Sequence, residues 1–309
     1  MVEIRSRIQE LFDKNTSKGS YSLFDSEHPL KIYLGTNDEG EKSLVIVSNL
    51  NRIEVFSSKL IRVEYEGYSE DHLSLSFSLL EEKLAEIFYS FCEDVIKNTY
   101  SAHESDGFLP VIERYEVWQK FFKRNNNFLS ESEIKGLIGE LLFLKKYLLP
   151  KYGEDKAIAA YIGIEGGHKD FELGETWHEI KAIHNGASSV NISSIEQLES
   201  ERVGHLEVVV LDDGGQSELS VNLNKLVNDV SNSLSGDNLR KFNDKMLEKG
   251  YIQNDYYNTY SYIPISATRY LVKDDFPKLT KDALPDGILS AKYELSLLAI
   301  KDYKESTWI

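Results

Sequence analysis

The segment that most restricts the fold of this chain is residues 168–181, where two strand-like runs flank the dipeptide Gly174-Glu175. A two-residue connection with glycine first is typical of a tight β-hairpin. Such a turn fixes the register, because a slip of one residue would move every side chain to the other face. The predicted register pairs Leu173 with Thr176, Glu172 with Trp177, Phe171 with His178 and Asp170 with Glu179.

This register places two carboxylates, Asp170 and Glu179, opposite each other on one face of the hairpin. Directly opposed side chains have Cβ atoms about 4.5–5.5 Å apart, and like charges at that separation are destabilising. A divalent cation between them would remove the repulsion, since Mg²⁺ binds through one or two carboxylates and keeps several waters. Lys181 lies two residues beyond Glu179 and therefore projects from the same face, where it can reach a phosphate oxygen or a water.

A helix precedes the hairpin. Ser130 and Glu133 form a capping-box pattern, an apolar stripe runs from Ile134 to Leu148, and Pro150 is expected to end the helix. The remaining pattern predicts an order of α-β-β-β-α-β in a mixed α/β (α+β) fold. The elements expected after the first helix are strands at 157–164, 169–173 and 176–183, a helix at 194–201 and a strand at 205–211.

Asp170, followed one short hairpin later by Glu179-Ile180-Lys181, resembles the motif of the PD-(D/E)XK nuclease superfamily. Members of that superfamily share an α-β-β-β-α-β core, so the resemblance implies a restriction-endonuclease-like fold. Lys169 stands where the name of the motif has proline. The motif covers about residues 130–212. The whole chain is similar, more loosely, to PD-(D/E)XK proteins encoded near restriction and phage-defence genes.

The resemblance implies two further site residues. An acid on the first core helix often completes the metal site, and Glu140 holds the matching position. At about 100° per residue it lies on the border of the apolar stripe. Glu133, one heptad earlier, is the alternative. Gly136 and Gly139 would allow close backbone approach. On the second core helix, Gln197 matches a polar residue near the active site, although it also belongs to an ordinary capping box.

The expected function is metal-dependent hydrolysis of DNA phosphodiester bonds by an endonuclease of a restriction or phage-defence system. Mg²⁺ is the expected cofactor, with Mn²⁺ as a substitute, held by Asp170, Glu179 and Glu140. Lys181 would orient the attacking water and stabilise charge on the phosphate, with Gln197 beside it. The expected partners are DNA and either a second copy of the chain or other defence-system subunits.

Three alternatives stay open at this point. The fold could serve as a catalytically silent scaffold or DNA-binding subunit of a defence complex, which the acidic net charge of −16 favours. The substrate could be RNA or a nucleotide. Finally, His168, His178 and His184 could indicate zinc, but the register turns His178 and His184 away from Asp170 and Glu179. We therefore expect His178 to be a hydrogen-bonded core or interface histidine.

Composition and charge restrict the class of protein and its expected location. The 309 residues carry net charges of −9 over 1–110, −1 over 111–185 and −6 over 186–309. The single cysteine, Cys92, excludes an intramolecular disulfide. The apolar runs are too short for a membrane span, and a cytoplasmic location is expected. Three regions are predicted: a β-rich N-terminal domain at 1–105, the nuclease core at 106–215 and a C-terminal α+β region at 216–309.

The two outer regions carry their own expected elements. The N-terminal region is predicted to hold strands at 30–34, 43–48, 60–65 and 72–77, followed by a helix at 79–98. The C-terminal region is predicted to hold helices at 221–234 and 238–249 and strands at 270–273 and 291–300.

Overall fold

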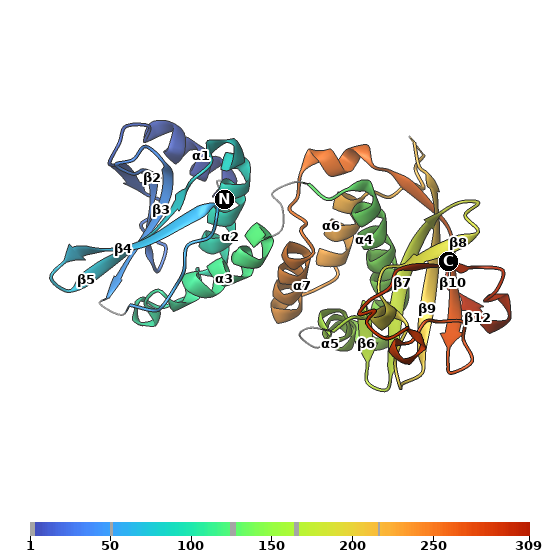
Figure 1. Ribbon diagram of the computed structural model, residues 1–309. Helices are drawn as coiled ribbons and strands as arrows, with labels where there is room; N and C mark the ends of the chain where they lie inside the picture. The colour runs from blue at the N-terminus through green and yellow to red at the C-terminus, as the bar shows by residue number, and fades with distance from the viewer. Residues whose placement is uncertain (1–3, 50–51, 124–127, 164–166, 216) are drawn as a thin grey trace. The chain divides into compact units, whose positions relative to one another are not determined.

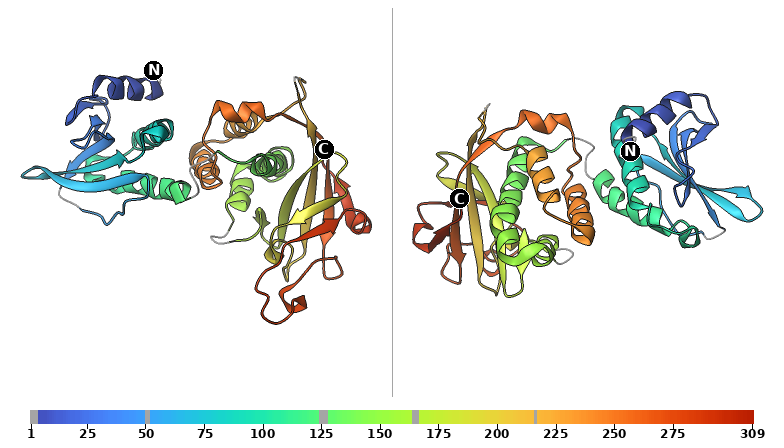
Figure 2. Two further views of the ribbon diagram at one scale, coloured as in Figure 1. Left: turned by 45° about the horizontal axis from the view of Figure 1, so that its top comes forward. Right: turned by 180° about the vertical axis from the view of Figure 1, so that it is seen from behind.

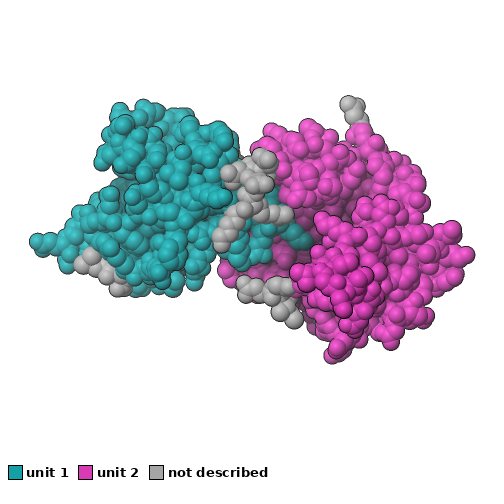
Figure 3. All heavy atoms as spheres, in the orientation of Figure 1, with its two compact units in different colours: residues 1–127, 246–252 teal, residues 128–245, 253–309 magenta. Residues whose placement is uncertain are grey.

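The chain divides into two compact units in a computed structural model, which describes residues 4–49, 52–123, 128–163, 167–215 and 217–309. Unit 1 comprises residues 1–127 and 246–252, and unit 2 comprises residues 128–245 and 253–309 (Figure 3). The predicted domain boundary near residue 105 lies inside unit 1, and residues 216–245 and 253–309 lie in the same unit as the hairpin.

Unit 1 is an antiparallel sheet with helices packed on one face (Figures 1 and 2). Apolar side chains from alternate strand positions meet the helices there, as the period of two in a strand requires. The four predicted strands are confirmed and the helix predicted at 79–98 is confirmed from Ala85 onwards, whereas α1 and β1 were not predicted. In sheet order the strands are β1 (Ser20–Leu23), β2 (Lys31–Thr36), β3 (Lys42–Asn49), β5 (His72–Leu79) and β4 (Ile61–Ser69), and the helices are α1 (Ile4–Lys14), α2 (Ala85–Asn98) and α3 (Leu109–Lys123).

Unit 2 is built on a mixed five-stranded sheet in which β7 and β9 are parallel and the other neighbours are antiparallel. A separate two-stranded sheet pairs β8 with β11. The mixed α+β fold class is therefore as predicted. In sheet order the strands are β12 (Lys304–Thr307), β10 (Tyr262–Val272), β9 (Gly204–Asp213), β7 (Thr176–His184) and β6 (Phe171–Leu173), and the second sheet holds β8 (Ser189–Ile192) and β11 (Tyr293–Ser296).

The predicted hairpin register is confirmed for three of its four pairs, and the fourth, Asp170 with Glu179, is not part of the strand ladder. Phe171 pairs with His178, Glu172 with Trp177 and Leu173 with Thr176. Gly174 has a φ of +53°, which a glycine adopts without steric cost at the first position of such a turn. Asp170 lies one residue before the first paired position of β6.

The helix before the hairpin starts as predicted, since Ser130 and Glu133 close a reciprocal capping box on α4 (Glu131–Phe143). A π-helical stretch, Leu144–Leu148, leads into α5 (Leu149–Ile162). The prediction that Pro150 ends the helix is wrong, because proline is tolerated in the first turn of a helix. The break comes instead at Gly153, whose φ is +76°.

The strand predicted at 157–164 is also wrong over its described residues. Ala157, Ile158, Ala160 and Tyr161 belong to α5 and are buried. A short apolar run fits a strand and a buried helix equally well, so its periodicity alone could not decide. Residue 164 lies outside the described residues.

The helix predicted at 194–201 is reduced to one 3₁₀ turn, Ile195–Gln197. The Lys169 ammonium donates to the backbone carbonyls of Glu196 and Glu199 there, at 2.6 and 3.1 Å. The strand predicted at 205–211 is confirmed as β9, and β8 was not predicted.

The C-terminal predictions are confirmed in part. The two predicted helices are α6 (Leu223–Ser231) and α7 (Gly236–Glu248). The strand predicted at 270–273 is only the end of the long β10, and the one predicted at 291–300 is limited to the four residues of β11.

The two faces of β7 meet different partners. Helix α4 covers one face, where a Cβ on Gly139 would lie 3.3 Å from both Ile180 Cγ2 and Ala182 Cβ. The expectation of close approach is thus confirmed for Gly139, whereas a Cβ on Gly136 would meet nothing within 4 Å. On the other face, Trp177 packs with residues of β8, β9 and β11. Because side chains alternate along a strand, Glu179 and Lys181 share the face of Trp177.

No helix in the described ranges combines the length and the apolar sequence that crossing a membrane would need. The cytoplasmic location stays a prediction.

The contact between β7 and β9 gives a test of the core of unit 2. A Cβ on Gly204 would lie 2.0 Å from Cε2 of the fully buried Trp177. Gly204→Ala should therefore lower the free energy of unfolding by about 1–3 kcal/mol, as overpacking does. Gly136→Ala, in an open helical position, should instead raise it by about 0.5–1 kcal/mol. Chemical unfolding followed by circular dichroism checks both values, and equal effects of the two variants would contradict this packing.

Candidate active site

Asp170 is fixed at the open end of the hairpin. Its Oδ2 accepts a hydrogen bond from the backbone N–H of Ile180 at 2.8 Å. The carboxylate thereby extends the hydrogen bonding of the hairpin one step beyond the Phe171–His178 pair. This bond holds the half-buried side chain beside the strand that carries Glu179 and Lys181.

Glu179 is a buried carboxylate with one oxygen unused. The residue is 1 % exposed, and its Oε1 lies 2.9 Å from Lys181 Nζ. Its Oε2 has no hydrogen-bond partner among the described residues. Burial, and then the negative charge of Asp170, raise the pKa of Glu179 to about 8, although Lys181 opposes the shift. A carboxylate destabilised by its surroundings is typical of functional sites.

Lys181 is held on two sides. Its ammonium donates to Gln197 Oε1 at 2.9 Å and pairs with Glu179. The same Gln197 oxygen accepts the backbone N–H of Ser193 at 2.8 Å, which orients the amide. The structure therefore brings Lys181 and Gln197 together as the resemblance implied, even though the helix expected to carry Gln197 is a single turn.

Glu140 approaches from α4 and is 8 % exposed. Its Oε2 accepts a hydrogen bond from the Tyr161 hydroxyl at 3.0 Å. Burial raises the pKa of Tyr161 well above its ordinary value, and the charges of Glu140 and Asp170 raise it further. The charges of both carboxylates thus raise the pKa of the same phenol. The alternative, Glu133, is engaged by Ser130 in the capping box.

Two residues of this region were missed by the sequence analysis. Tyr161 was assigned to a strand, and no signal marked its hydroxyl as a partner of Glu140. Lys169 was noted only as a departure from the motif. Its Nζ lies 3.8 Å from the centre of the Trp177 ring, and burial lowers its pKa to about 8. Together with its bonds to the Glu196 and Glu199 carbonyls, this contact ties the Gln197 turn to the hairpin.

The donor set fits a divalent cation bound by two carboxylates. In the described part of the chain, no three His, Cys, Asp or Glu residues form a group that could hold a metal ion. The unpartnered Oε2 of Glu179 and the neighbouring Asp170 nevertheless suit Mg²⁺, which takes one or two carboxylates and completes its shell with water. The role of Glu140 as a further ligand stays a prediction.

The histidines do not form a shared site. His178 points to the face of β7 opposite Glu179, and its Nδ1 lies 2.9 Å from Oε1 of the fully buried Glu207. The prediction of a hydrogen-bonded core histidine is confirmed. His184, at the end of β7, lies 3.4 Å from Asp213, and His168 is exposed. The described histidines belong to no metal-binding group.

Lys181 borders open space. A cavity of about 340 Å³ lies between the end of β7 and β8. Its lining includes Lys181, His184, Ser189 and Asn191. This volume is at the lower end of the range that small-molecule sites occupy. The end of β7 at Lys181 therefore borders space that a ligand can enter.

The raised pKa of Glu179 predicts an inverse pH dependence of stability. The pKa of Glu179 is about 8 in the fold and 4.5 ordinarily. Its contribution to the free energy of unfolding is therefore fully present below pH 4.5 and is lost as the pH rises towards 8. Glu179→Gln should therefore unfold at the same denaturant concentration as the wild type near pH 4.5. At pH 8, in the presence of a chelator, it should be more stable by on the order of 2–4 kcal/mol. A variant that is less stable than the wild type at pH 8 would contradict the destabilised carboxylate.

Comparison with known proteins agrees with this geometry. Residues 9–298 match the family model described as "Putative PD-(D/E)XK family member, (DUF4420)". Neither a curated protein nor a solved structure matches the chain. The matched range includes the hairpin, α4, the Gln197 turn and most of unit 1. On this match over nearly its whole length, the chain belongs to that PD-(D/E)XK family.

Proposed function

We propose that this protein is a metal-dependent nuclease that hydrolyses phosphodiester bonds of DNA at the β6–β7 hairpin. One observation carries the proposal: Glu179, buried and with an unpartnered oxygen, feels the negative charge of Asp170 and pairs with the ammonium of Lys181. Folding alone gains nothing from a carboxylate in such a place. A cation would bind Asp170 and Glu179, and a phosphate would interact with Lys181.

Asp170 and Glu179 are the residues that would hold the cation, Mg²⁺ or Mn²⁺. When bound, it supplies positive charge that stabilises the negative charge developing on the phosphate. The hydrogen bond from the backbone N–H of Ile180 occupies one oxygen of Asp170 and orients the carboxylate. Glu140, oriented by Tyr161, is the proposed further ligand, directly or through water.

Lys181 is proposed to act on the substrate. Gln197 and Glu179 hold its ammonium, and the residue lines the 340 Å³ cavity through which a phosphate and the attacking water would approach. A preoriented ammonium loses little free energy to reorganisation during the reaction. Gln197 is a positioning residue on this account, because it acts through Lys181.

The charge of the chain bears on the choice of substrate. The neighbouring acids Asp170 and Glu179 repel a phosphate when no cation is present, so activity should depend strictly on metal. The net charge of −16 does not oppose this, since global charge governs long-range steering and not what a single cleft binds. DNA as the partner, and a role in restriction or phage defence, rest on the family resemblance.

A second candidate function is a silent scaffold or DNA-binding subunit with a nuclease fold. It is favoured by the lack of a three-ligand group among the described residues and by the acidic net charge. The two candidates differ in whether the isolated protein binds a divalent cation.

Calorimetric titration with Mg²⁺ and Mn²⁺, followed by incubation with supercoiled plasmid, tests the proposal. Asp170→Asn and Glu179→Gln should abolish cation binding and nicking, because each removes a ligand charge. Lys181→Met should still bind the cation but nick at least about 100-fold more slowly, as loss of a charge-stabilising donor does. Glu175→Gln, an exposed position in the turn of the same hairpin, is the matched control and should behave like the wild type.

Two results would decide against the nuclease. Cation binding that survives Glu179→Gln would place the metal elsewhere. A wild-type protein that binds no cation and cuts neither DNA nor RNA would favour the scaffold.

A further inference from the structure

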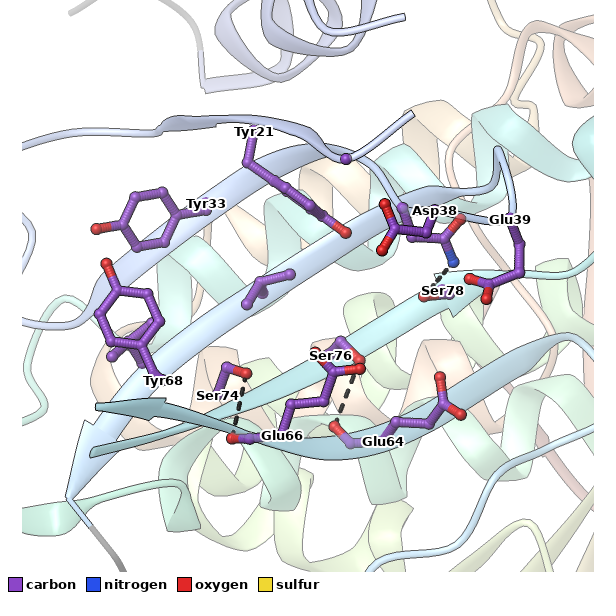
Figure 4. A pocket seen from close by; sticks show the side chains of 14 residues that line it. Tyr21, Tyr33, Asp38, Glu39, Glu64, Glu66, Tyr68, Ser74, Ser76 and Ser78 are labelled. Carbon is purple, nitrogen blue, oxygen red and sulfur yellow. Dashed lines mark hydrogen bonds between the residues drawn. The ribbon is translucent and has the colours of Figure 1, made fainter. Parts of the chain in front are cut away.

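Unit 1 carries a trough of its own, on the face of its sheet that the helices leave uncovered (Figure 4). Its volume is about 560 Å³, and every residue that lines it belongs to unit 1. The side chains come from alternate positions of β2, β3, β4 and β5, so they point away from the core. The trough is independent of the proposed nuclease site.

Small serine side chains of β5 form the floor of the trough. Ser74 and Ser76 of β5 donate their hydroxyls to the backbone carbonyls of Glu66 and Glu64 on β4, at 3.4 and 3.3 Å. These bonds occupy the hydroxyls within the sheet and leave the carboxylates of Glu64 and Glu66 to line the trough. Valines 45 and 47 of β3 add an apolar strip.

Aromatic rings form one end of the trough. Tyr33 and Tyr68 meet there at their hydroxyl ends, and Tyr21 leans over the floor (Figure 4). Tyr68 is 56 % exposed, so most of its ring is open to a ligand although its hydroxyl interacts with Tyr33. Ring faces attract cations through their quadrupole.

The other end and one side of the trough are acidic. Asp38 and Glu39 occupy the turn after β2, and Glu64 and Glu66 lie along β4 (Figure 4). Two bases lie nearby: Arg62 is shared between Glu39, Glu41 and Glu64, and the Lys18 side chain lies beside Gly40 in the turn. In the part of the chain that the structure describes, Asp38 and Glu66 form no ion pair. Lys31 lies on the same face by its pairing with Val47 but does not line the trough.

The charge of these acids reaches into the trough. Burial raises the pKa of Tyr21, the hydrogen bond from Ser43 lowers it, and the charges of Asp38, Glu66 and Glu39 raise it. A field that opposes ionisation of a phenol favours a cation at the same place. The acids are not gathered as a metal site, since the described residues contain no such group.

We propose that this trough binds an extended, basic segment of a partner protein, with arginine or lysine side chains seated between the tyrosine rings and the carboxylates. The length of the trough is the reason for proposing a peptide and not a single small amine. From Ser74 to Ser78 the floor runs four residues along β5, about 13 Å at the rise of a strand. An extended segment of similar length presents side chains at the same spacing. A single free amine would fill only part of this volume.

Fluorescence anisotropy with the full-length chain tests the proposal. The probe is a labelled peptide with arginine at alternate positions, and a citrulline peptide of the same sequence is its uncharged control. Asp38→Asn combined with Glu66→Gln should weaken binding of the arginine peptide about tenfold or more. Tyr68→Leu should weaken it about two- to fivefold, whereas Tyr68→Phe, which keeps the ring, should bind like the wild type.

A matched variant controls for the acidity of the chain. Glu113→Gln combined with Glu116→Gln removes the same two charges from exposed positions of α3, on the helical face of unit 1. It should leave the affinity within about twofold of the wild type, since screened charges on another face contribute little. An equal loss of affinity in this variant would mean that the peptide responds only to the net charge of the chain, which would overturn the proposal.

Two further outcomes would also overturn it. One is equal binding of the citrulline and arginine peptides. The other is a single amine, arginine methyl ester, that binds the wild type as tightly as the peptide does, because the site would then be one for a small amine. Circular dichroism of each variant confirms that unit 1 remains folded.

Discussion

The burial of Glu179 beside Lys181 is the constraint on which the candidate site depends. An ionisable carboxylate at 1 % exposure, with one oxygen unpartnered among the described residues, is costly to the fold. The ion pair to Lys181 offsets part of that cost, and the charge of Asp170 adds to it. Proteins retain such arrangements mainly where a ligand or a reaction uses them. The surrounding structure can be understood as the support of this one strand.

That support comes from both sides of β7. On one face, Gly139 lets α4 approach Ile180 and Ala182 closely, which brings Glu140 into the region. On the other face, Lys169 holds the turn of Gln197 against the hairpin. Gln197 in turn orients Lys181. The ammonium is therefore positioned by the side chains of Glu179 and Gln197, whereas Asp170 and the Gln197 amide are oriented by backbone N–H groups.

The sequence predicted the part of the site that local rules decide. A two-residue turn sets the register, so the placement of Asp170 beside Glu179 and Lys181 followed from counting along the hairpin. It could not predict features that depend on tertiary contacts. The segment 157–162 is apolar enough for either strand or helix, and Tyr161 was missed because the wrong element was chosen. The predicted second helix is a single 3₁₀ turn, which its capping-box pattern did not reveal.

The most direct test of the central claim is anomalous diffraction from crystals of the wild-type protein grown with Mn²⁺. The account predicts an anomalous peak within ligand distance of the carboxylates of Asp170 and Glu179, with the Oε2 of Glu179 now coordinated. No peak at the hairpin, together with an unchanged ion pair between Glu179 and Lys181, would contradict a metal-dependent active site there.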